Sequence, residues 1–186
     1  AVVILTGQAG MFSGGYDLKT MKESSDAAVA LVTEGSKLTR RMLSFPFPII
    51  GACTGHAIAK GAFLLLSCDH RIGSTGAFKI GLNEVAIGMT MHQAGIELAR
   101  NRIPSNYLTR SVINAELFDP ETALMAGFID TLVEPDKVIS TAISVATQML
   151  ALNMNAHHGT KLRERKDILT ALDTAITQDS TMTLNL

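Results

Sequence analysis

The sequence predicts an α/β fold with mostly parallel strands and a helical region toward the C-terminal end. Two apolar runs, Val2–Leu5 and Ile49–Cys53, contain no polar alternation, as expected for strands buried on both faces of a parallel sheet. Each run leads through a glycine-rich turn into a segment with helical character. This alternation of strand, turn and helix is the βαβ rhythm, and we expect 186 residues that are 47% hydrophobic to fold as one unit.

The first half of the chain contains three predicted strands separated by helices. Pro46 and Pro48 end the second helix, because proline cannot continue a helical hydrogen-bond ladder. The polar stretch Lys22–Asp26 is predicted to be a mobile loop between the first two helices. The expected elements are a strand at Val2–Leu5, a helix from Asp17 or Leu18, a helix through Val29, Val32 and Leu38–Leu43, a strand at Ile49–Cys53, a short buried helix at Gly61–Ser67 and a strand at Arg71–Ser74.

The second half is predicted to be mostly helical. Asp119-Pro120-Glu121 begins one of these helices and Gly127 ends it, with proline at the first helical position and glycine at the exit. The expected elements are helices at His92–Arg100, Ser105–Ile113 and from Asp119 to Gly127, a last strand at Ile129–Glu134, a helix from Pro135 to about Leu152 and a final helix at His157–Ile176.

Composition excludes several classes of partner. The net charge is −1, from 16 basic and 17 acidic residues, so no overall field attracts nucleic acid or an anionic membrane. We find no apolar stretch long enough for a membrane span and no basic-then-apolar leader. Cys53 and Cys68 lie in apolar runs and are interpreted as core packing in a reducing compartment. We expect a cytoplasmic protein. The chain opens inside a strand and is expected to begin within a longer protein, so import into an organelle stays an alternative.

The two glycine-rich turns are the main functional signal. Gly14 and Gly15 allow positive φ or a close approach to a ligand, and the helix that follows adds partial positive charge. In the second turn the backbone N–H of Lys60 points out of the first turn of a helix, while its side chain is expected to be solvated. Two such turns can aim N–H groups at one point and stabilise a developing oxyanion. A tight turn with no further role explains either of them alone.

Glu84 is the carboxylate we expect to carry chemistry. It lies in an apolar segment, where desolvation would raise its pKa toward the range of a proton shuttle. The alternative is a structural ion pair with Arg71 or Arg100. His92 either caps the next helix or faces the same cavity as Glu84. Asp17 is better explained as a helix cap than as a catalytic acid.

The remaining polar residues give weaker signals. His56 and the pair His157 and His158 have no partners at metal-ligand spacing, so no metal site is expected. The nine methionines are interpreted as core filling and pocket lining. The basic run Lys161–Lys166 is typical of a solvated helix face, and it could also pair with the phosphates of a ligand.

Several motifs, in order and spacing, resemble the crotonase (enoyl-CoA hydratase/isomerase) superfamily over roughly residues 1–150. They are Ala1-Val-Val-Ile-Leu-Thr-Gly7, Phe12-Ser-Gly-Gly-Tyr-Asp-Leu-Lys19, Pro48-Ile-Ile-Gly-Ala-Cys-Thr-Gly-His-Ala57, Cys68-Asp-His-Arg-Ile72, Phe118-Asp-Pro-Glu-Thr-Ala123 and Ala126-Gly-Phe-Ile-Asp130. The resemblance implies a Clp/crotonase spiral of ββα units over residues 1–134, without its first strands. It also implies a helical region at 135–186, in the same domain or in a trimer contact. A homotrimer or a dimer of trimers would follow.

The resemblance also implies roles for individual residues. Gly14 and Lys60 match the two positions whose backbone N–H groups bind the thioester oxygen, although the family usually has glycine at the second. The segment with Ser13, Gly15, Tyr16, Asp17 and Leu18 matches the wall that receives coenzyme A, and Gly61 and Phe63 are expected beside the substrate. Glu84 matches the second of two acidic positions in hydratases. Coenzyme A would then be part of the substrate, with no other cofactor, and Lys161, Arg163 or Lys166 could strengthen its binding.

Phe63 stands where the resemblance implies the first acidic residue, which bears on the reaction. Hydration is most easily performed by two carboxylates, whereas one carboxylate can move a proton from C2 to C4 of an enoyl thioester. An apolar Phe63 would also exclude water from the site. We therefore expect an acyl-CoA-processing enzyme, either an enoyl-CoA delta-isomerase or an enoyl-CoA hydratase, with isomerase chemistry ranked first. The alternatives are a non-catalytic scaffold subunit of the same superfamily and, more remotely, a Clp-type serine peptidase, for which Ala59-Lys60-Gly61 lacks the serine.

Overall fold

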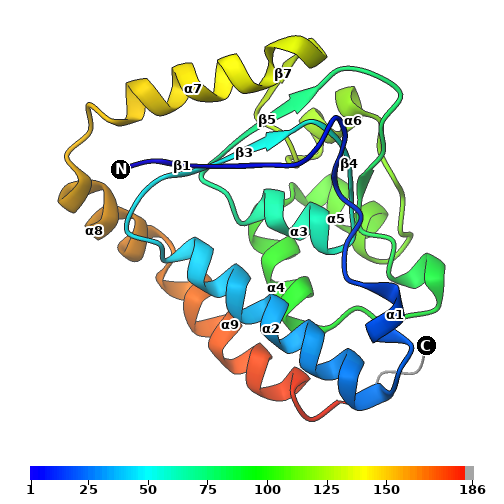
Figure 1. Cartoon of the computed structure of the whole chain (residues 1–186). Helices are drawn as coiled ribbons and strands as arrows, with labels where there is room; N and C mark the ends of the chain where they lie inside the picture. Colours follow the sequence, from blue (N-terminus) through cyan, green and yellow to red (C-terminus); the bar gives the residue numbers. More distant parts are fainter. Residues whose placement is uncertain (183–186) are drawn as a thin grey trace.

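Two parallel sheets form the centre of the computed structural model, which describes residues 1–182 (Figure 1). The first sheet has the order β1-β3-β5-β7 and the second has the order β2-β4-β6. All neighbouring strands in both sheets are parallel. The first sheet is built from β1 (Val3–Thr6), β3 (Ile49–Cys53), β5 (His70–Ser74) and β7 (Thr131–Val133), and the second from β2 (Gly10–Ser13), β4 (Gly55–Ile58) and β6 (Ile80–Gly81).

The division into two sheets corrects the expectation that the two glycine-rich turns leave one sheet. After each of β1, β3 and β5 of the first sheet, the chain forms a second short strand in the other sheet, so the repeating unit has two strands. Glycine makes the close packing of these short strands possible. A β-carbon on Gly55 would lie 2.1 Å from the carbonyl carbon of Gly10, the residue paired with it in β2. The ββα unit is therefore repeated along the chain.

Side-chain caps begin several of the helices. Asp17 accepts from Lys19 N and Thr20 N at the start of α1 (Leu18–Met21), and Ser24 accepts from Ala27 N at the start of α2 (Ser25–Leu43). The predicted mobile loop at Lys22–Asp26 is therefore too long, because the Ser24 hydroxyl starts α2 inside it. The other helices are α3 (Lys60–Leu66), η1 (Val85–Ile87), α4 (Gln93–Arg102), α5 (Ser105–Val112), α6 (Pro120–Met125), η2 (Pro135–Lys137), α7 (Val138–Met149), α8 (Met154–Glu164) and α9 (Lys166–Asp179).

The C-terminal helices differ from the prediction at one point. The expected single helix at His157–Ile176 is two helices, α8 and α9, which meet at Arg165. Arg165 directs its guanidinium to Asp69 and to the carbonyl of Leu43, while Lys161 one turn earlier reaches the same Asp69. The break lets α9 pack against α2 and α4, and Figure 1 shows α2 and α9 side by side.

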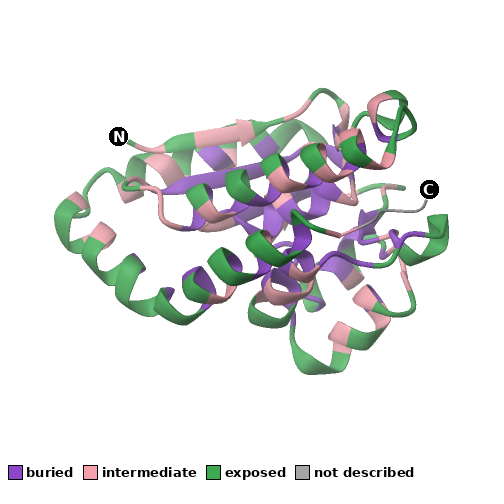
Figure 2. Ribbon diagram, turned by 90° about the horizontal axis from the view of Figure 1, so that it is seen from below, coloured by how far each residue is buried: buried purple, intermediate pink, exposed green. Residues whose placement is uncertain are grey.

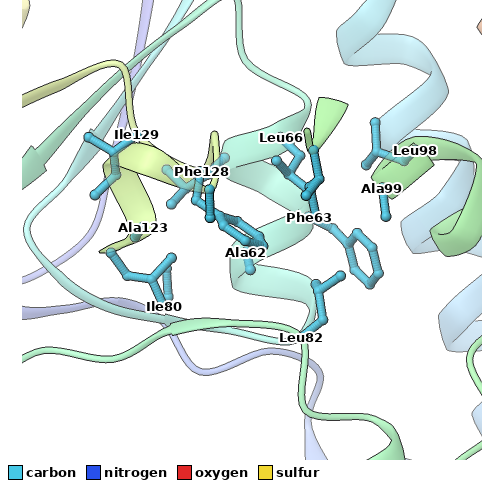
Figure 3. Close-up of a cluster of buried hydrophobic side chains, with 14 of the residues drawn as sticks. Ala62, Phe63, Leu66, Ile80, Leu82, Leu98, Ala99, Ala123, Phe128 and Ile129 are labelled. Carbon is cyan, nitrogen blue, oxygen red and sulfur yellow. The ribbon is translucent and has the colours of Figure 1, made fainter. Parts of the chain in front are cut away.

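The hydrophobic core is divided into separate clusters. The largest surrounds α3 and includes Phe63, Leu66 and Phe128, and Figure 3 shows it in close-up. A smaller cluster contains Met21 of α1, Ala28 and Val32 of α2, and Met89. Figure 2 shows the buried residues gathered in the interior, with the outer faces of the helices exposed. The smaller cluster contributes Met21, Val32 and Met89 to the wall of the cavity described below.

The two cysteines pack as predicted. Cys53 and Cys68 are both buried and free, and burial raises the pKa of each thiol to about 12. Their thiols donate to the carbonyls of Gly55 and Leu64. Within residues 1–182, no helix has the length and apolar character needed to cross a bilayer.

Candidate active site

A cavity of about 320 Å³ lies between α1, α2, the turn before α3 and the segment that joins β6 to α4. Its wall combines residues from both glycine-rich turns with the carboxylate singled out in the sequence. The lining residues are Gly14, Tyr16, Leu18, Met21, Lys22, Val32, Ala59, Asn83, Glu84, Ile87, Met89 and His92.

The first turn follows β2 and contributes Gly14 and Tyr16 to the cavity wall. Gly15 has φ of +103°, a left-handed conformation that favours glycine, and its N–H donates to Ser13 Oγ at 3.3 Å. Asp17 is exposed and caps α1, as the sequence predicted, so its carboxylate is engaged by backbone N–H groups outside the cavity lining. Leu18 lies on the wall with 62% of its surface exposed, which places it at the mouth.

The second turn follows β4 and meets the first. A β-carbon built on Gly15 would lie 3.2 Å from Ala59 Cβ and 3.6 Å from Lys60 N. A β-carbon on Gly61 would lie 2.2 Å from the carbonyl oxygen of Ser13, so glycine is needed there for α3 to approach β2. Gly61 therefore has a packing role, and it does not line the cavity. The two turns that the sequence singled out are in contact.

The backbone of the second turn is strained at a residue other than glycine. Ala59 has φ of +51° and ψ of −119°, and no side chain caps α3. Lys60 follows Ala59 and is not among the residues with positive φ, so a residue with a side chain fits this position without backbone strain. Strain of this kind persists where surrounding contacts maintain it, and it is frequent at functional sites.

The side chain of Lys60 is buried, which corrects the expectation that it is solvated. Only 7% of the residue is exposed, and Nζ donates to the carbonyl of Gly35 and to Thr39 Oγ1, both in α2. Burial lowers the pKa of this ammonium to about 7. The sequence prediction failed because the acceptors are 25 and 21 residues away along the chain and carry no charge pattern.

Glu84 lies on the cavity wall and is buried, with 6% of its surface exposed. Within the described residues Oε2 of Glu84 has no hydrogen-bond partner. Desolvation raises the pKa of its carboxyl group to about 7. The alternative of an ion pair with Arg71 or Arg100 is wrong, because Arg71 pairs with Asp130 and Arg100 with Glu97. A buried carboxylate without a cation is suited to exchanging a proton with a ligand.

Tyr16, Asn83 and His92 complete the polar part of the wall. Burial, with the nearby charge of Glu84, raises the pKa of the Tyr16 hydroxyl, which donates to the carbonyl of Val32 at 3.5 Å. Oδ1 of Asn83 has no partner among residues 1–182. The sequence analysis missed Asn83, although its position directly before Glu84 was a usable signal.

His92 faces the cavity, one of the two positions that the sequence left open. It precedes α4, but its side chain makes no capping hydrogen bond. The cap is supplied instead by Asp179 at the end of α9, which accepts from Gln93 N and Ala94 N at 2.8 Å each. Burial lowers the pKa of the imidazole to about 4, opposed by the charge of Asp179, so His92 is neutral near pH 7.

Phe63 does not line the cavity, contrary to the expectation that it contacts substrate and excludes water. It is 2% exposed and packs in the main core, where Figure 3 shows it close to Leu82. Its ring meets that of His92 edge to face, with centroids 5.4 Å apart. The reason is that helix α3 turns this position toward α4, behind the imidazole. Phe63 is therefore separated from the cavity and contacts His92, which lines it.

The basic run in the C-terminal helices is not one solvated face. Lys161 is 6% exposed and donates to Asp69 and to the carbonyls of Phe45 and Phe47, so its ammonium is already engaged. Arg163 and Lys166 are exposed, outside the cavity lining. The lysine on the cavity wall is Lys22, which is exposed and was not singled out in the sequence.

Other predicted features lie outside the cavity. His56 accepts from Lys79 N through Nδ1 and stacks edge to face with Phe78. The described part of the chain contains no group of three His, Cys, Asp or Glu residues arranged to hold a metal ion. Among its described lining residues the cavity also has no serine or cysteine, so the peptidase alternative has no nucleophile there.

Known proteins resemble this chain in sequence. The sequence model of one family, described as enoyl-CoA hydratase/isomerase, matches residues 1–186. The 2,3-dehydroadipyl-CoA hydratase of Escherichia coli is 26% identical over 96% of this chain and 69% of the relative. The human mitochondrial enoyl-CoA delta isomerase 1 is 30% identical over 89% of this chain, and the match spans 55% of the relative, little more than half of its length.

A solved structure is closer still in sequence. The crystal structure of an enoyl-CoA hydratase/isomerase family protein from Pseudomonas syringae is 61% identical, with a TM-score of 0.97, and the match covers 98% of this chain and 80% of that one. Both reaction names therefore occur among the relatives. The fold that these likenesses share is the crotonase spiral of ββα units followed by helices.

Proposed function

This chain belongs to the enoyl-CoA hydratase/isomerase family, and from that premise we propose that it moves the double bond of an enoyl-CoA thioester. The observation that carries the proposal is the single carboxylate on the cavity wall. Glu84 is buried, lacks a partner among the described residues and lies beside two turns that contact each other. One base facing one carbonyl-binding site is the minimum that proton transfer next to a thioester requires.

The proposed reaction transfers one proton and adds no atoms. Ionised Glu84 takes a proton from C2 of a 3-enoyl thioester, and the electron pair spreads over C2 to C4 and the thioester oxygen. The backbone N–H groups of Gly14 and Lys60 would donate to that oxygen while it carries negative charge. Protonated Glu84 then returns the proton to C4, which leaves the conjugated 2-enoyl thioester. A pKa of about 7 is suited to this exchange, because both forms of the carboxyl group are populated near neutral pH.

Two further observations favour isomerisation over hydration. Glu84 is the only Asp or Glu among the described lining residues of the cavity. The position of the other acid is Phe63, which is buried behind His92 and cannot orient a water molecule. Asn83, which precedes Glu84 in the sequence, and neutral His92 also line the cavity, and neither is a strong base here. Coenzyme A enters this scheme as part of the substrate.

The shape of the cavity supports an acyl-CoA ligand. Leu18, Ile87 and exposed Lys22 surround the part of the wall that faces solvent, where the coenzyme would enter. Met21, Val32 and Met89 form an apolar wall deeper in the molecule, suited to a hydrocarbon chain. The segment from Ser13 to Leu18 is proposed to lie along the coenzyme.

Turnover of Glu84→Gln tests the proposal. Short and medium 3-enoyl-CoA thioesters would be supplied, and both formation of the conjugated product and its hydration would be followed. We expect the unaltered chain to form the conjugated thioester, and Glu84→Gln to lower kcat by about 10³-fold, the scale of general acid–base catalysis. Binding of a saturated acyl-CoA should stay within about tenfold, because the amide keeps the size of the carboxyl group.

Glu97→Gln is the matched control, because Glu97 pairs with Arg100 outside the cavity and should leave kcat unchanged. Acyl-CoA binding without turnover by the unaltered chain would contradict the proposal and support a scaffold subunit. Hydration faster than double-bond migration would instead support the hydratase.

A further inference from the structure

The side chain of Lys60 is a buried cation that is not paired with a carboxylate. Within residues 1–182 its ammonium forms no ion pair, and both of its acceptors, the Gly35 carbonyl and the Thr39 hydroxyl, are neutral. The bond to Thr39 Oγ1 measures 2.7 Å. Burial of an amino group without a counter-ion disfavours its charged form, so the presence of Lys60 beside the cavity requires an explanation.

The location of Lys60 links two parts of the site. Its backbone begins α3 directly after Ala59, the strained residue of the second turn, while its ammonium is held by α2. No side chain caps α3, and the N–H of Ala59 donates to the carbonyl of Gly81 in β6, which holds this side of the turn against the second sheet. The two hydrogen bonds of Nζ are the polar contacts that tie this turn to the helix opposite.

The place where Lys60 meets α2 is also the place where the cavity wall is packed. A β-carbon on Gly35 would lie within 1.9 Å of the Tyr16 hydroxyl, so Tyr16 and Lys60 both contact α2 at the same glycine. Tyr16 bonds to the carbonyl of Val32, one turn before Gly35, and both Tyr16 and Val32 line the cavity. A movement of Lys60 would therefore change the turn and the wall together.

We propose that the Lys60 side chain is a positioning residue: by bonding Gly35 and Thr39 it holds the Ala59–Lys60 turn at the distance from helix α2 at which the Lys60 N–H faces the thioester oxygen. This inference rests on the proposed function. The buried ammonium lies outside the cavity lining and acts through the backbone of its own residue.

Substitution of Lys60 by methionine tests the proposal, because methionine keeps an unbranched apolar side chain and removes the ammonium. A misplaced oxyanion donor affects the transition state more than the ground state, so kcat should fall by about 10- to 100-fold. The dissociation constant of butyryl-CoA should change by less than about threefold. Lys37→Met is the control, because Lys37 lies on the exposed side of α2 and pairs only with Glu34 among the described residues. It should leave both quantities unchanged.

Thr39→Val provides a second variant that remains informative if Lys60→Met does not fold. Thr39 does not line the cavity, and valine replaces its hydroxyl with a methyl group. We expect kcat to fall by about 3- to 10-fold without a change in butyryl-CoA binding. The double variant Lys60→Met/Thr39→Val should be no slower than Lys60→Met alone, because both changes break the same contact.

The possible results separate this inference from the proposed function. Absence of turnover by the unaltered chain would overturn both. Turnover by the unaltered chain with unchanged kcat in Thr39→Val and in folded Lys60→Met would overturn only the role of Lys60, even if both variants unfolded at lower temperature. Independent, multiplicative losses in the double variant would also overturn it, because Thr39 would then act without Lys60.

Discussion

Two groups of buried charge in this molecule differ in how they are satisfied. Beneath the C-terminal helices, Asp69 accepts from Lys161 Nζ at 2.8 Å and from Ile49 N at 2.7 Å, and it pairs with Arg165 at 2.9 Å. In the cavity region, Glu84 has an oxygen without a partner among the described residues, and Lys60 bonds only neutral acceptors. All five charged side chains belong to residues that are largely buried.

The difference separates charged residues that stabilise the fold from charged residues that serve the candidate site. The Asp69 group connects α8 and α9 to the region between α3 and β5, and each of its two cations is paired with the same carboxylate. Burial of such a network makes it sensitive to the loss of any member. Glu84 and Lys60 are buried without compensation, which costs stability and leaves them available to a ligand or to the backbone that faces it. Three changes test this distinction.

Asp69→Asn should have the largest effect on stability. Removal of the carboxylate leaves buried Lys161 without an anion and Arg165 with only exposed Glu164, 3.4 Å away, which we expect to lower the free energy of unfolding by about 3–5 kcal/mol. The measurement is urea unfolding followed by circular dichroism. Asp136→Asn is the control, because Asp136 is exposed and pairs with adjacent Lys137, so a change within about 0.5 kcal/mol is expected. Equal changes in the free energy of unfolding for the two substitutions would show that the Asp69 ion pairs do not stabilise the fold.

Glu84→Gln should raise the free energy of unfolding, by an amount that depends on pH. Burial raises the pKa of Glu84 from 4.5 to about 7, so between these values the folded state binds more protons than the unfolded state. The free energy of unfolding therefore falls as pH rises through this window, and the loss is complete above about pH 7. At pH 8 the Gln variant should be more stable than the unaltered chain by about 3 kcal/mol.

The pH dependence itself is the sensitive part of that measurement. Near pH 4 the two chains should have almost equal stability, because Glu84 is then protonated in both the folded and the unfolded state. Taking the difference between the chains cancels the contributions of Lys60 and His92, which also titrate. A stability difference that does not change between pH 4 and pH 8 would show that Glu84 is not desolvated.

Gly35→Ala should have the smallest effect and tests how tightly the wall of the site is packed. The new β-carbon would overlap the Tyr16 hydroxyl at 1.9 Å, so Tyr16 or α2 must move, at a cost of about 1–3 kcal/mol. Gly159→Ala is a matched substitution in α8, where no atom lies within 4 Å, and it should stabilise the chain by about 0.5–1 kcal/mol. Unfolding in urea compares them, and stabilisation by both would mean that the wall is loose.

Much of the fold followed from local patterns. Ile49–Cys53 is a strand with the predicted bounds, and Asp119, Pro120 and Gly127 define α6 as predicted, with φ of +81° at Gly127. These succeed because a continuous apolar run, a proline at the first turn and a glycine at the exit each act within a few residues. The division of α8 from α9 was missed, because it depends on Asp69, about 90 residues earlier in the chain.

The candidate site was predicted only in part, because local patterns identify single residues and do not show which distant segments meet. Glu84, Gly14 and Tyr16 were singled out, and all three line one cavity. Phe63 was placed in the cavity by its position in a motif, but the orientation of α3 directs it into the main core. Asp179 was not considered, although it caps α4 next to His92 from the far end of the described chain. Motif spacing predicts which segment approaches the site and does not predict the direction of each side chain.

The sequence by itself determined the order of the strands of the first sheet and of most helices, the position of two glycine-rich turns and the burial of one carboxylate. These properties depend on backbone conformation and hydrophobicity, which are expressed over a few neighbouring residues. Only the tertiary structure decided that the strands form two sheets, that Lys161 forms an ion pair with Asp69, and that the side chain of Lys60 is buried and bonded to α2. The physical reason is that a charge acquires its partner, and hence its role, through contacts between segments distant in the chain.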